Sequence, residues 1–149
     1  MTLLHALAPD LEVLLRLGAA VVCSVAIGYN RAHHYREPHL NKPHLRLHVL
    51  VGLSACLMVL AAGSDPNAYS RSIQGVATGV GFLGAGQILQ DRRTDDGGRD
   101  EVFVHGLTSA AAVWLTAALS VTVATSSAGL AIIALVLALG ILSLDRSRR

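Results

Sequence analysis

The longest stretch without a charged residue most constrains how this chain can fold. It runs from Val102 to Leu144, 43 residues without Asp, Glu, Lys or Arg. As one straight helix it would be about 65 Å long, roughly twice the hydrocarbon thickness of a bilayer. The stretch must therefore fold back, and residues 125–129, Thr-Ser-Ser-Ala-Gly, suit a turn. The pattern predicts two membrane-spanning helices, at about 103–124 and 128–144.

Three further apolar runs predict spans at about 11–29, 45–63 and 72–90. The chain is 52% hydrophobic and only 15% charged, whereas soluble domains contain about 25% charged residues. We therefore expect one domain over residues 1–149: an all-α, polytopic membrane protein with a bundle of about five transmembrane helices. The first ten residues contain no Lys or Arg, so we expect no cleaved signal peptide.

The basic residues predict the orientation of the bundle. Ten of the 12 Lys and Arg residues fall in segments 30–46, 91–101 and 145–149. Five spans place these three segments on the same side, and basic segments remain in the cytoplasm. Only Arg16 and Arg71 would then lie outside. The sequence thus predicts an N-out, C-in topology.

A glycine-rich run occupies the third predicted span. There is no charge from Ser72 to Gln90, and five of the 14 glycines lie in this run. Small residues let membrane helices approach closely, so we expect this span to be the central packing helix. We predict in particular that Gly79 and Gly81 contact the fourth span. The predicted helix-packing glycines are Gly75, Gly79, Gly81, Gly84, Gly86 and Gly106.

The same run contains Gly79-x-Gly81-x-x-Gly84, which matches the dinucleotide-binding fingerprint. That fingerprint has meaning only between a strand and a helix, and no strand is predicted before Gly79. We therefore favour helix packing. We find no nucleophile–base set, no metal triad and no sign of nucleic-acid binding, and we expect a non-enzyme without a cofactor.

A polar cluster is expected where the first two spans end on the cytoplasmic side. It comprises Arg31, Arg46 and His48, with Asn30 beside them. The histidines of the loop at 30–46 could bind a transition metal, but we favour a solvated, pH-sensitive loop. Cys23 and Cys56 lie in apolar runs and are expected to be packing residues.

Two further polar features leave alternatives open. Glu12 and Arg16 are four residues apart and can form an interfacial ion pair, or Arg16 can bind a buried carbonyl or ligand group. No Asp or Glu lies within residues 13–29, 47–63, 73–90 or 102–144, which weakens the case for cation or proton transport. A polar path nevertheless remains open, with these candidates: Gln74, Thr78, Gln87, Thr108, Trp114 and Thr116.

Two motifs also resemble a known family. Gly79-Val-Gly-Phe-Leu-Gly-Ala-Gly86 and the stretch from Val104 to Ala118, Val-His-Gly-Leu-Thr-Ser-Ala-Ala-Ala-Val-Trp-Leu-Thr-Ala-Ala, are similar to the MgtC/SapB family of bacterial inner-membrane proteins. The resemblance implies a role in magnesium limitation or acid adaptation, associated in some pathogens with virulence. It also implies a membrane-protein partner, such as the ATP synthase or a transporter.

Two departures from the family pattern are visible. The family has Gly-Leu-Glu-Arg where the first span ends, whereas this chain has Gly28-Tyr29-Asn30-Arg31. We also expect a short form without the cytoplasmic domain that follows the fifth span in many members. Two functions remain open: a regulator that contacts another membrane protein and can itself oligomerise, or a transporter or channel for magnesium, protons or a small solute.

Overall fold

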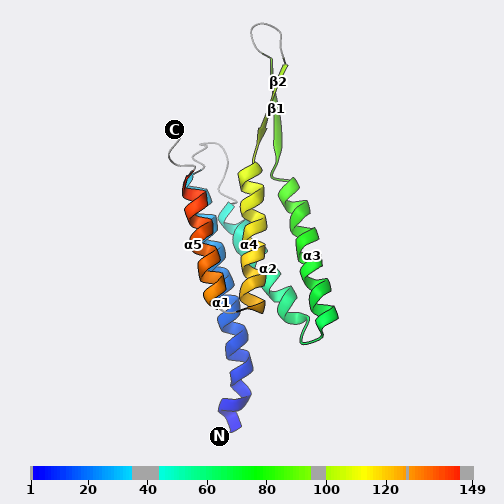
Figure 1. The fold of residues 1–149 in the computed structure, drawn as a ribbon, viewed down its shortest axis with the longest axis vertical. Helices are drawn as coiled ribbons and strands as arrows, with labels where there is room; N and C mark the ends of the chain where they lie inside the picture. Colours follow the sequence, from blue (N-terminus) through cyan, green and yellow to red (C-terminus); the bar gives the residue numbers. More distant parts are fainter. Residues whose placement is uncertain (1, 35–43, 95–99, 127, 145–149) are drawn as a thin grey trace.

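The computed structural model describes residues 2–34, 44–94, 100–126 and 128–144, and this part contains five helices and one β-hairpin. The helices are α1 (Thr2–His34), α2 (His44–Ala61), α3 (Pro66–Ala85), α4 (Leu107–Thr125) and α5 (Ala128–Leu144). They run alternately up and down, so α1 begins at one end of the bundle and α5 ends at the other (Figure 1). The prediction of five helices is confirmed.

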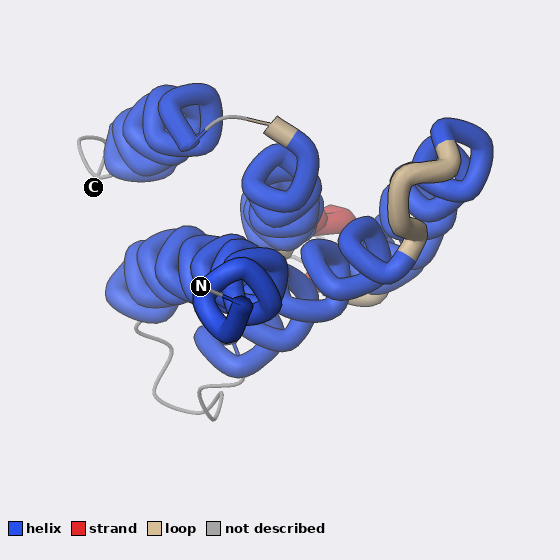
Figure 2. The backbone as a smooth tube through the Cα atoms, turned by 90° about the horizontal axis from the view of Figure 1, so that it is seen from below, coloured by secondary structure: helices blue, strands red, loops and turns tan. Residues whose placement is uncertain are grey.

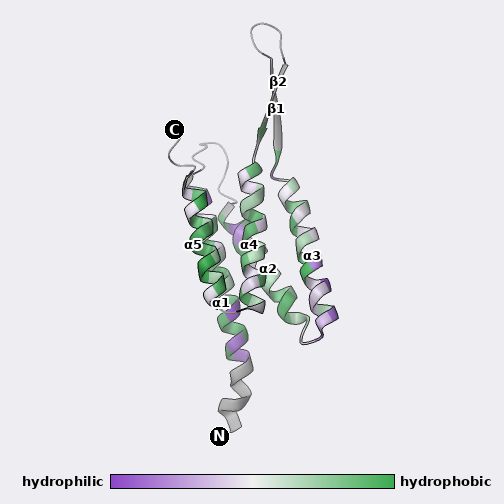
Figure 3. Cartoon of the chain, in the orientation of Figure 1, coloured by the Kyte–Doolittle hydropathy of each residue, from purple (hydrophilic) through white to green (hydrophobic). Residues whose placement is uncertain are grey.

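Two of the helices are long and apolar enough to cross a membrane. They are the Asp10–Ala32 part of α1 and the whole of α4, Leu107–Thr125. The apolar stretches of α2 and α5, Leu45–Ala61 and Ala128–Ser143, are shorter. Figure 3 shows that α4 and α5 are mostly hydrophobic along their length, whereas α3 is polar in its first turns.

Helix α4 is at the centre of the bundle. It contacts each of the other four helices, whereas α3 contacts chiefly α4 and α2. Figure 2 shows α3 and α5 on different sides of α4. The main core joins α1, α2, α3 and α4 through small and β-branched side chains, among them Ala20, Val59, Val80 and Val113. The prediction that the glycine-rich helix is the packing centre is therefore wrong.

The glycine-rich helix also begins and ends earlier than its predicted range. Asp65 caps its first turn, because the carboxylate accepts hydrogen bonds from the backbone N–H groups of Asn67 (3.1 Å) and Ala68 (3.3 Å). Pro66 follows at the first helical position, where a missing N–H costs nothing. These local signals start α3 at Pro66, and it ends at Ala85.

An antiparallel hairpin connects α3 to α4. It comprises β1 (Leu89–Thr94) and β2 (Asp100–His105), with a register from Leu89 opposite His105 to Thr94 opposite Asp100. It extends beyond the bundle (Figure 1). The predicted spans at 72–90 and 103–124 include residues 89–90 and 103–105 of this hairpin, so the hairpin corrects those two ends. Val102, Phe103 and Val104 are β-branched or aromatic, and such residues favour a strand. This part of the chain therefore belongs to β2 and not to the fourth helix.

The first helix begins at Thr2, before the predicted start at Leu11. Pro9 therefore lies inside α1, where it removes one backbone hydrogen bond without ending the helix. Helices α2 and α5 match the predicted spans within two residues, and the turn before α5 falls at its predicted place.

Candidate functional site

A line of buried polar side chains lies between α1, α2 and α4. Arg31 is 2% exposed and His48 is 1% exposed, although both can carry a charge. The remaining members are hydroxyl side chains: Ser24, Ser109, Thr116 and Ser120. Ionisable groups inside a membrane bundle are costly, so they mark functional sites by default. We call these six residues the polar line.

Arg31 is bound to α4 near the end that carries the hairpin. Its Nη2 donates a hydrogen bond of 3.2 Å to Ser109 Oγ. Ser109 is the third residue of α4, and Arg31 lies in the last turn of α1. The guanidinium therefore links the ends of two helices that are 78 residues apart in sequence.

His48 is bound to α4 two turns deeper. Its Nδ1 lies 2.7 Å from Thr116 Oγ1, and Thr116 Oγ1 in turn donates to the carbonyl of Ala112 at 2.8 Å. The Thr116 hydroxyl has one proton and two neighbouring acceptors, so the donor in the His48–Thr116 bond depends on the tautomer of the imidazole.

The deepest members of the polar line meet around Gly52 of α2. A Cβ atom at this position would overlap Ser24 Oγ and would lie 2.8 Å from Ser120 Oγ. Ser24 Oγ donates to the Ala20 carbonyl at 2.6 Å. Ser120 Oγ is buried and has no hydrogen-bond partner among the described residues. Gly52 therefore allows α1, α2 and α4 to approach closely at a polar contact.

Arg16 binds α4 at the opposite end. Its guanidinium donates to the carbonyl oxygens of Val123, at 3.1 Å, and Ala124. It also forms an ion pair with Glu12 at 2.8 Å. Both alternatives left open for Arg16 therefore occur together. The last carbonyls of a helix carry partial negative charge. The Arg16 guanidinium therefore supplies hydrogen-bond donors to carbonyl groups at the C-terminal end of α4.

The predicted cluster of Arg31, Arg46, His48 and Asn30 is only partly brought together. Arg31 and His48 are buried and both bind α4, whereas Arg46 is exposed. The Asn30 amide donates to Ser143 Oγ of α5 at 3.3 Å, on another side of α1. Arg46 and Asn30 thus do not belong to the polar line.

The residues proposed for a polar path mostly lie on the surface. Gln74, Thr78, Thr108 and Trp114 are exposed and Gln87 is half-buried, whereas Thr116 is buried. Gln74 donates to Ser70 Oγ at 3.2 Å, and Thr78 donates to the Gln74 carbonyl at 2.9 Å, so both bond within α3. Except at Thr116, the predicted path is wrong, because these polar groups do not line the interior of the bundle.

The predicted packing glycines fall into two groups. Gly75, Gly79 and Gly81 are exposed, and a Cβ atom at any of them would have no neighbour within 4 Å. The predicted contact of Gly79 and Gly81 with the fourth span is therefore wrong, because these positions lie on the side of α3 turned away from α4. Gly84 is buried, and a Cβ atom there would lie 3.7 Å from the carbonyl oxygen of Ala110 of α4.

The last two predicted glycines lie at helix ends. Gly86 is the C-cap of α3 and is exposed. Gly106 precedes α4 with φ +89°, and a Cβ atom there would overlap the Gln87 carbonyl. Gly106 thus lets the hairpin close next to the bundle rather than joining two helices.

Two hydroxyl residues of α4, Ser109 and Ser120, are the part of the site that the sequence-based prediction missed. Ser109, Ala112, Thr116 and Ser120 recur at intervals of three and four residues, which places them on one face of a helix. That small and polar face is the signal that could have identified the side of α4 that meets α1 and α2.

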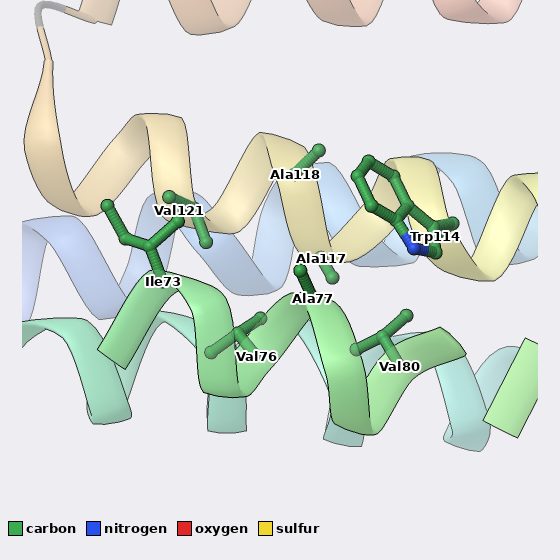
Figure 4. Close-up of a pocket in the computed structure, with 8 residues that line it drawn as sticks. All are labelled: Ile73, Val76, Ala77, Val80, Trp114, Ala117, Ala118 and Val121. Carbon is green, nitrogen blue, oxygen red and sulfur yellow. The ribbon is translucent and has the colours of Figure 1, made fainter. Parts of the chain in front are cut away.

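An apolar groove of about 160 Å³ separates parts of α3 and α4. Figure 4 shows its walls, which come from four residues of each helix. They are Ile73, Val76, Ala77 and Val80 of α3 and Trp114, Ala117, Ala118 and Val121 of α4. The described residues include no group of three or more His, Cys, Asp or Glu side chains that could hold a metal ion.

These observations define a five-helix bundle with a positively charged and hydroxylated interior. The chain belongs to the MgtC family, which it matches over residues 17–148, and the resemblance found in its motifs is thereby confirmed. No solved structure matches it.

Three relatives illustrate the similarity. Protein SrpB of Synechococcus elongatus is 41% identical over 117 residues, covering 72% of this chain and 60% of the relative. The Escherichia coli protein named "Putative magnesium transporter YhiD" is 32% identical over 125 residues, which cover 75% of this chain and 50% of the relative. Protein MgtC of Salmonella typhimurium is 30% identical over 109 residues, which cover 72% of this chain and 41% of the relative. The chain thus spans about half the length of these relatives.

Proposed function

We propose that this chain is a multi-pass protein of the bacterial inner membrane that regulates another membrane protein without catalysing a reaction. The name of one relative refers to magnesium, so we link the regulation to magnesium limitation, with acid adaptation as a related condition. The proposed partner is a transporter or the ATP synthase, as the family resemblance implies.

The observation that carries this proposal is the uncovered face of α3. Gly75, Gly79 and Gly81 have open space where a Cβ atom would be, and Phe82 is 81% exposed. The outer face of α5 differs, because its exposed residues are aliphatic: Ile132, Ile133, Val136, Leu137 and Ile141. Aliphatic faces suit lipid, whereas small-residue faces suit a second helix. We therefore propose that the outer face of α3 contacts the partner protein and that the outer face of α5 contacts lipid.

The membrane orientation that we propose is N-out, C-in. The alternating helix directions bring the end of α1, the start of α2, the hairpin and the end of α5 to one end of the bundle (Figure 1). The sequence segments at these points, 30–46, 91–101 and 145–149, hold ten of the 12 basic residues. This asymmetry supports a cytoplasmic location for that end.

Ion transport is the second candidate, and the polar line is the observation that favours it. A Mg²⁺ ion moving along this line would pass Arg31, which binds Ser109 of α4. The sequence from Val102 to Leu144, which includes α4 and α5, contains no acid. Fixed positive charges repel a cation strongly where the local dielectric is low. Regulation is therefore the function that the charges support better.

A matched pair of variants tests the proposal. Gly79→Leu on α3 and Gly140→Leu on α5 both fill open space, so both proteins should insert and keep their thermal stability. In a bacterium that depends on this gene, only Gly79→Leu should impair growth at low magnesium. Equal growth of the two variants would remove α3 as the regulatory surface. Magnesium flux into proteoliposomes that contain the purified chain alone would favour transport instead.

A further inference from the structure

The hairpin between α3 and α4 is a sheet of two strands with two unused edges. In the described part of the chain, β1 and β2 pair only with each other. No helix packs along either strand there, and the ribbon extends beyond the bundle (Figure 1). A two-stranded ribbon is at best marginally stable in water, and the backbone groups of a free edge can pair with another strand. The outer edges of β1 and β2 are therefore available for a further strand.

The two strands differ in charge. β1 contains Arg92, Arg93 and one acid, whereas β2 begins with Asp100 and Glu101 and contains no Lys or Arg. Within one chain the register places Arg93 opposite Glu101 and Arg92 opposite Val102. Opposite charges directly across two strands stabilise their pairing, and like charges destabilise it. The outer edge of β2 is thus complementary in charge to a strand such as β1.

Membrane insertion limits how two copies of this chain can meet. In the proposed membrane location, on which this inference rests, all copies have the same orientation and are related by rotation about the membrane normal. The hairpin extends along the long axis of the bundle (Figure 1), so this rotation makes equal strands parallel and unequal strands antiparallel. Parallel contacts of β1 with β1, or of β2 with β2, would place like charges side by side. Only β2 of one copy against β1 of the next combines antiparallel pairing with complementary charge.

We propose that the hairpin joins copies of this chain head to tail, with β2 of one copy paired to β1 of the next. Rotation about the membrane normal keeps each residue at its own height. Arg93 of one copy therefore lies level with Glu101 of the next, as it does within one chain. A head-to-tail contact whose rotation closes forms a ring. Two hairpins contribute too few strands for a closed barrel, so the ring contains more than two copies.

Crosslinking in isolated membranes tests which strands meet. Two differently tagged copies are co-expressed, one with Arg93→Cys and the other with Glu101→Cys. They are treated with a bis-maleimide that spans about 8 Å, the distance between diagonal neighbours on paired strands. We expect a covalent dimer that carries both tags. The native cysteines, Cys23 and Cys56, are buried and are present in every sample.

The matched control is a pair of tagged copies that both carry Arg93→Cys. Because β1 does not meet β1 in the proposed ring, this pair should crosslink at least about fivefold less than the mixed pair. Equal crosslinking of the two pairs, or no crosslinking of the mixed pair, overturns the proposal.

A charge exchange tests the specificity of the contact and leaves the hairpin its internal pair. In the double variant Arg93→Glu, Glu101→Arg, opposite charges still face each other within each chain and between two copies of the variant. A contact between variant and wild type instead places like charges opposite each other. Tagged wild type should therefore capture at least about threefold less variant than wild type.

The control for folding is capture of the variant by a tagged copy of itself, which should equal capture of wild type by wild type. Failure of this self-capture, or equal capture in the mixed pair, overturns the pairing of Arg93 with Glu101.

The number of copies is measured by native mass spectrometry of the wild-type chain, purified from membranes in mild detergent. We expect one assembly of more than two chains, and a mass of one or two chains overturns the ring. Recovery of the chain in the membrane fraction tests the membrane location separately. No partner protein is present in these experiments, so their failure and the failure of the proposed regulation are distinguishable.

Discussion

The contact around Gly52 shows that three helices meet here with no room for one additional carbon atom. Gly52→Ala would push its new methyl group into Ser24 Oγ and toward Ser120 Oγ. We expect the free energy of unfolding to fall by about 1–3 kcal/mol, as is usual for overpacked cores. Thermal unfolding in nanodiscs measures the change. Gly75→Ala is the control, because a Cβ atom there has open space, and equal stabilities would contradict the close approach.

A second prediction concerns the hydroxyl group that hydrogen-bonds to His48. Thr116→Val removes this hydroxyl and leaves the buried imidazole nitrogen without that partner, which should destabilise the protein by about 1–3 kcal/mol. Thr122→Val is a matched control, since Thr122 also donates to the carbonyl four residues earlier, at 2.9 Å, but is only partly buried. Thermal unfolding compares the two, and an equal loss would show that His48 does not depend on Thr116.

At the scale of whole helices, Arg16 should contribute more to the α1–α4 contact than its ion pair does. Arg16→Gln removes a charged donor from the last carbonyls of α4, which should cost about 1.5–3 kcal/mol. Glu12 is 64% exposed, and exposed ion pairs contribute about 0–1 kcal/mol. Glu12→Gln should therefore be nearly neutral. Chemical or thermal unfolding of both variants tests the difference, and equal effects would mean that the carbonyl contacts add nothing.

The existence of the helices could be predicted from the sequence, but their lateral arrangement could not. Apolar runs without charges give the number of helices and the approximate ends of α2 and α5. They do not say which helix is central, because in a membrane the apolar residues of every face look alike. The glycine pattern of α3 predicts buried contacts, yet Gly79 faces outward. The small face of α4 that begins at Ser109 is the buried one.

Only some residues of the polar line could be recognised from the sequence. Arg31 and His48 stand out as polar residues at the ends of apolar runs. Their partners Ser109 and Thr116 do not, because a hydroxyl side chain can also bond to its own helix and then lie on the surface. Thr78 does so on α3, with the same type of bond. Only the arrangement of α1, α2 and α4 distinguishes these two cases.

For the whole molecule, the basic residues predict which end faces the cytoplasm. An alkaline phosphatase reporter fused after Arg149 should be inactive in a bacterial host, because that enzyme folds only outside the cytoplasm. The same reporter inserted after Gly63, in the turn between α2 and α3, should be active. The reverse pattern of activities would invert the proposed topology.

The two arginines of α1 also have a consequence for biosynthesis. Arg16 and Arg31 emerge from the ribosome early, yet their α4 partners follow 107 and 78 residues later. At about 5–20 residues per second, α4 becomes available roughly 4–20 seconds after these arginines have been made. In the proposed membrane arrangement, α1 and α2 lack the helix that completes the bundle during that interval. A chain whose synthesis is interrupted before α4 should therefore be an early substrate for membrane proteases.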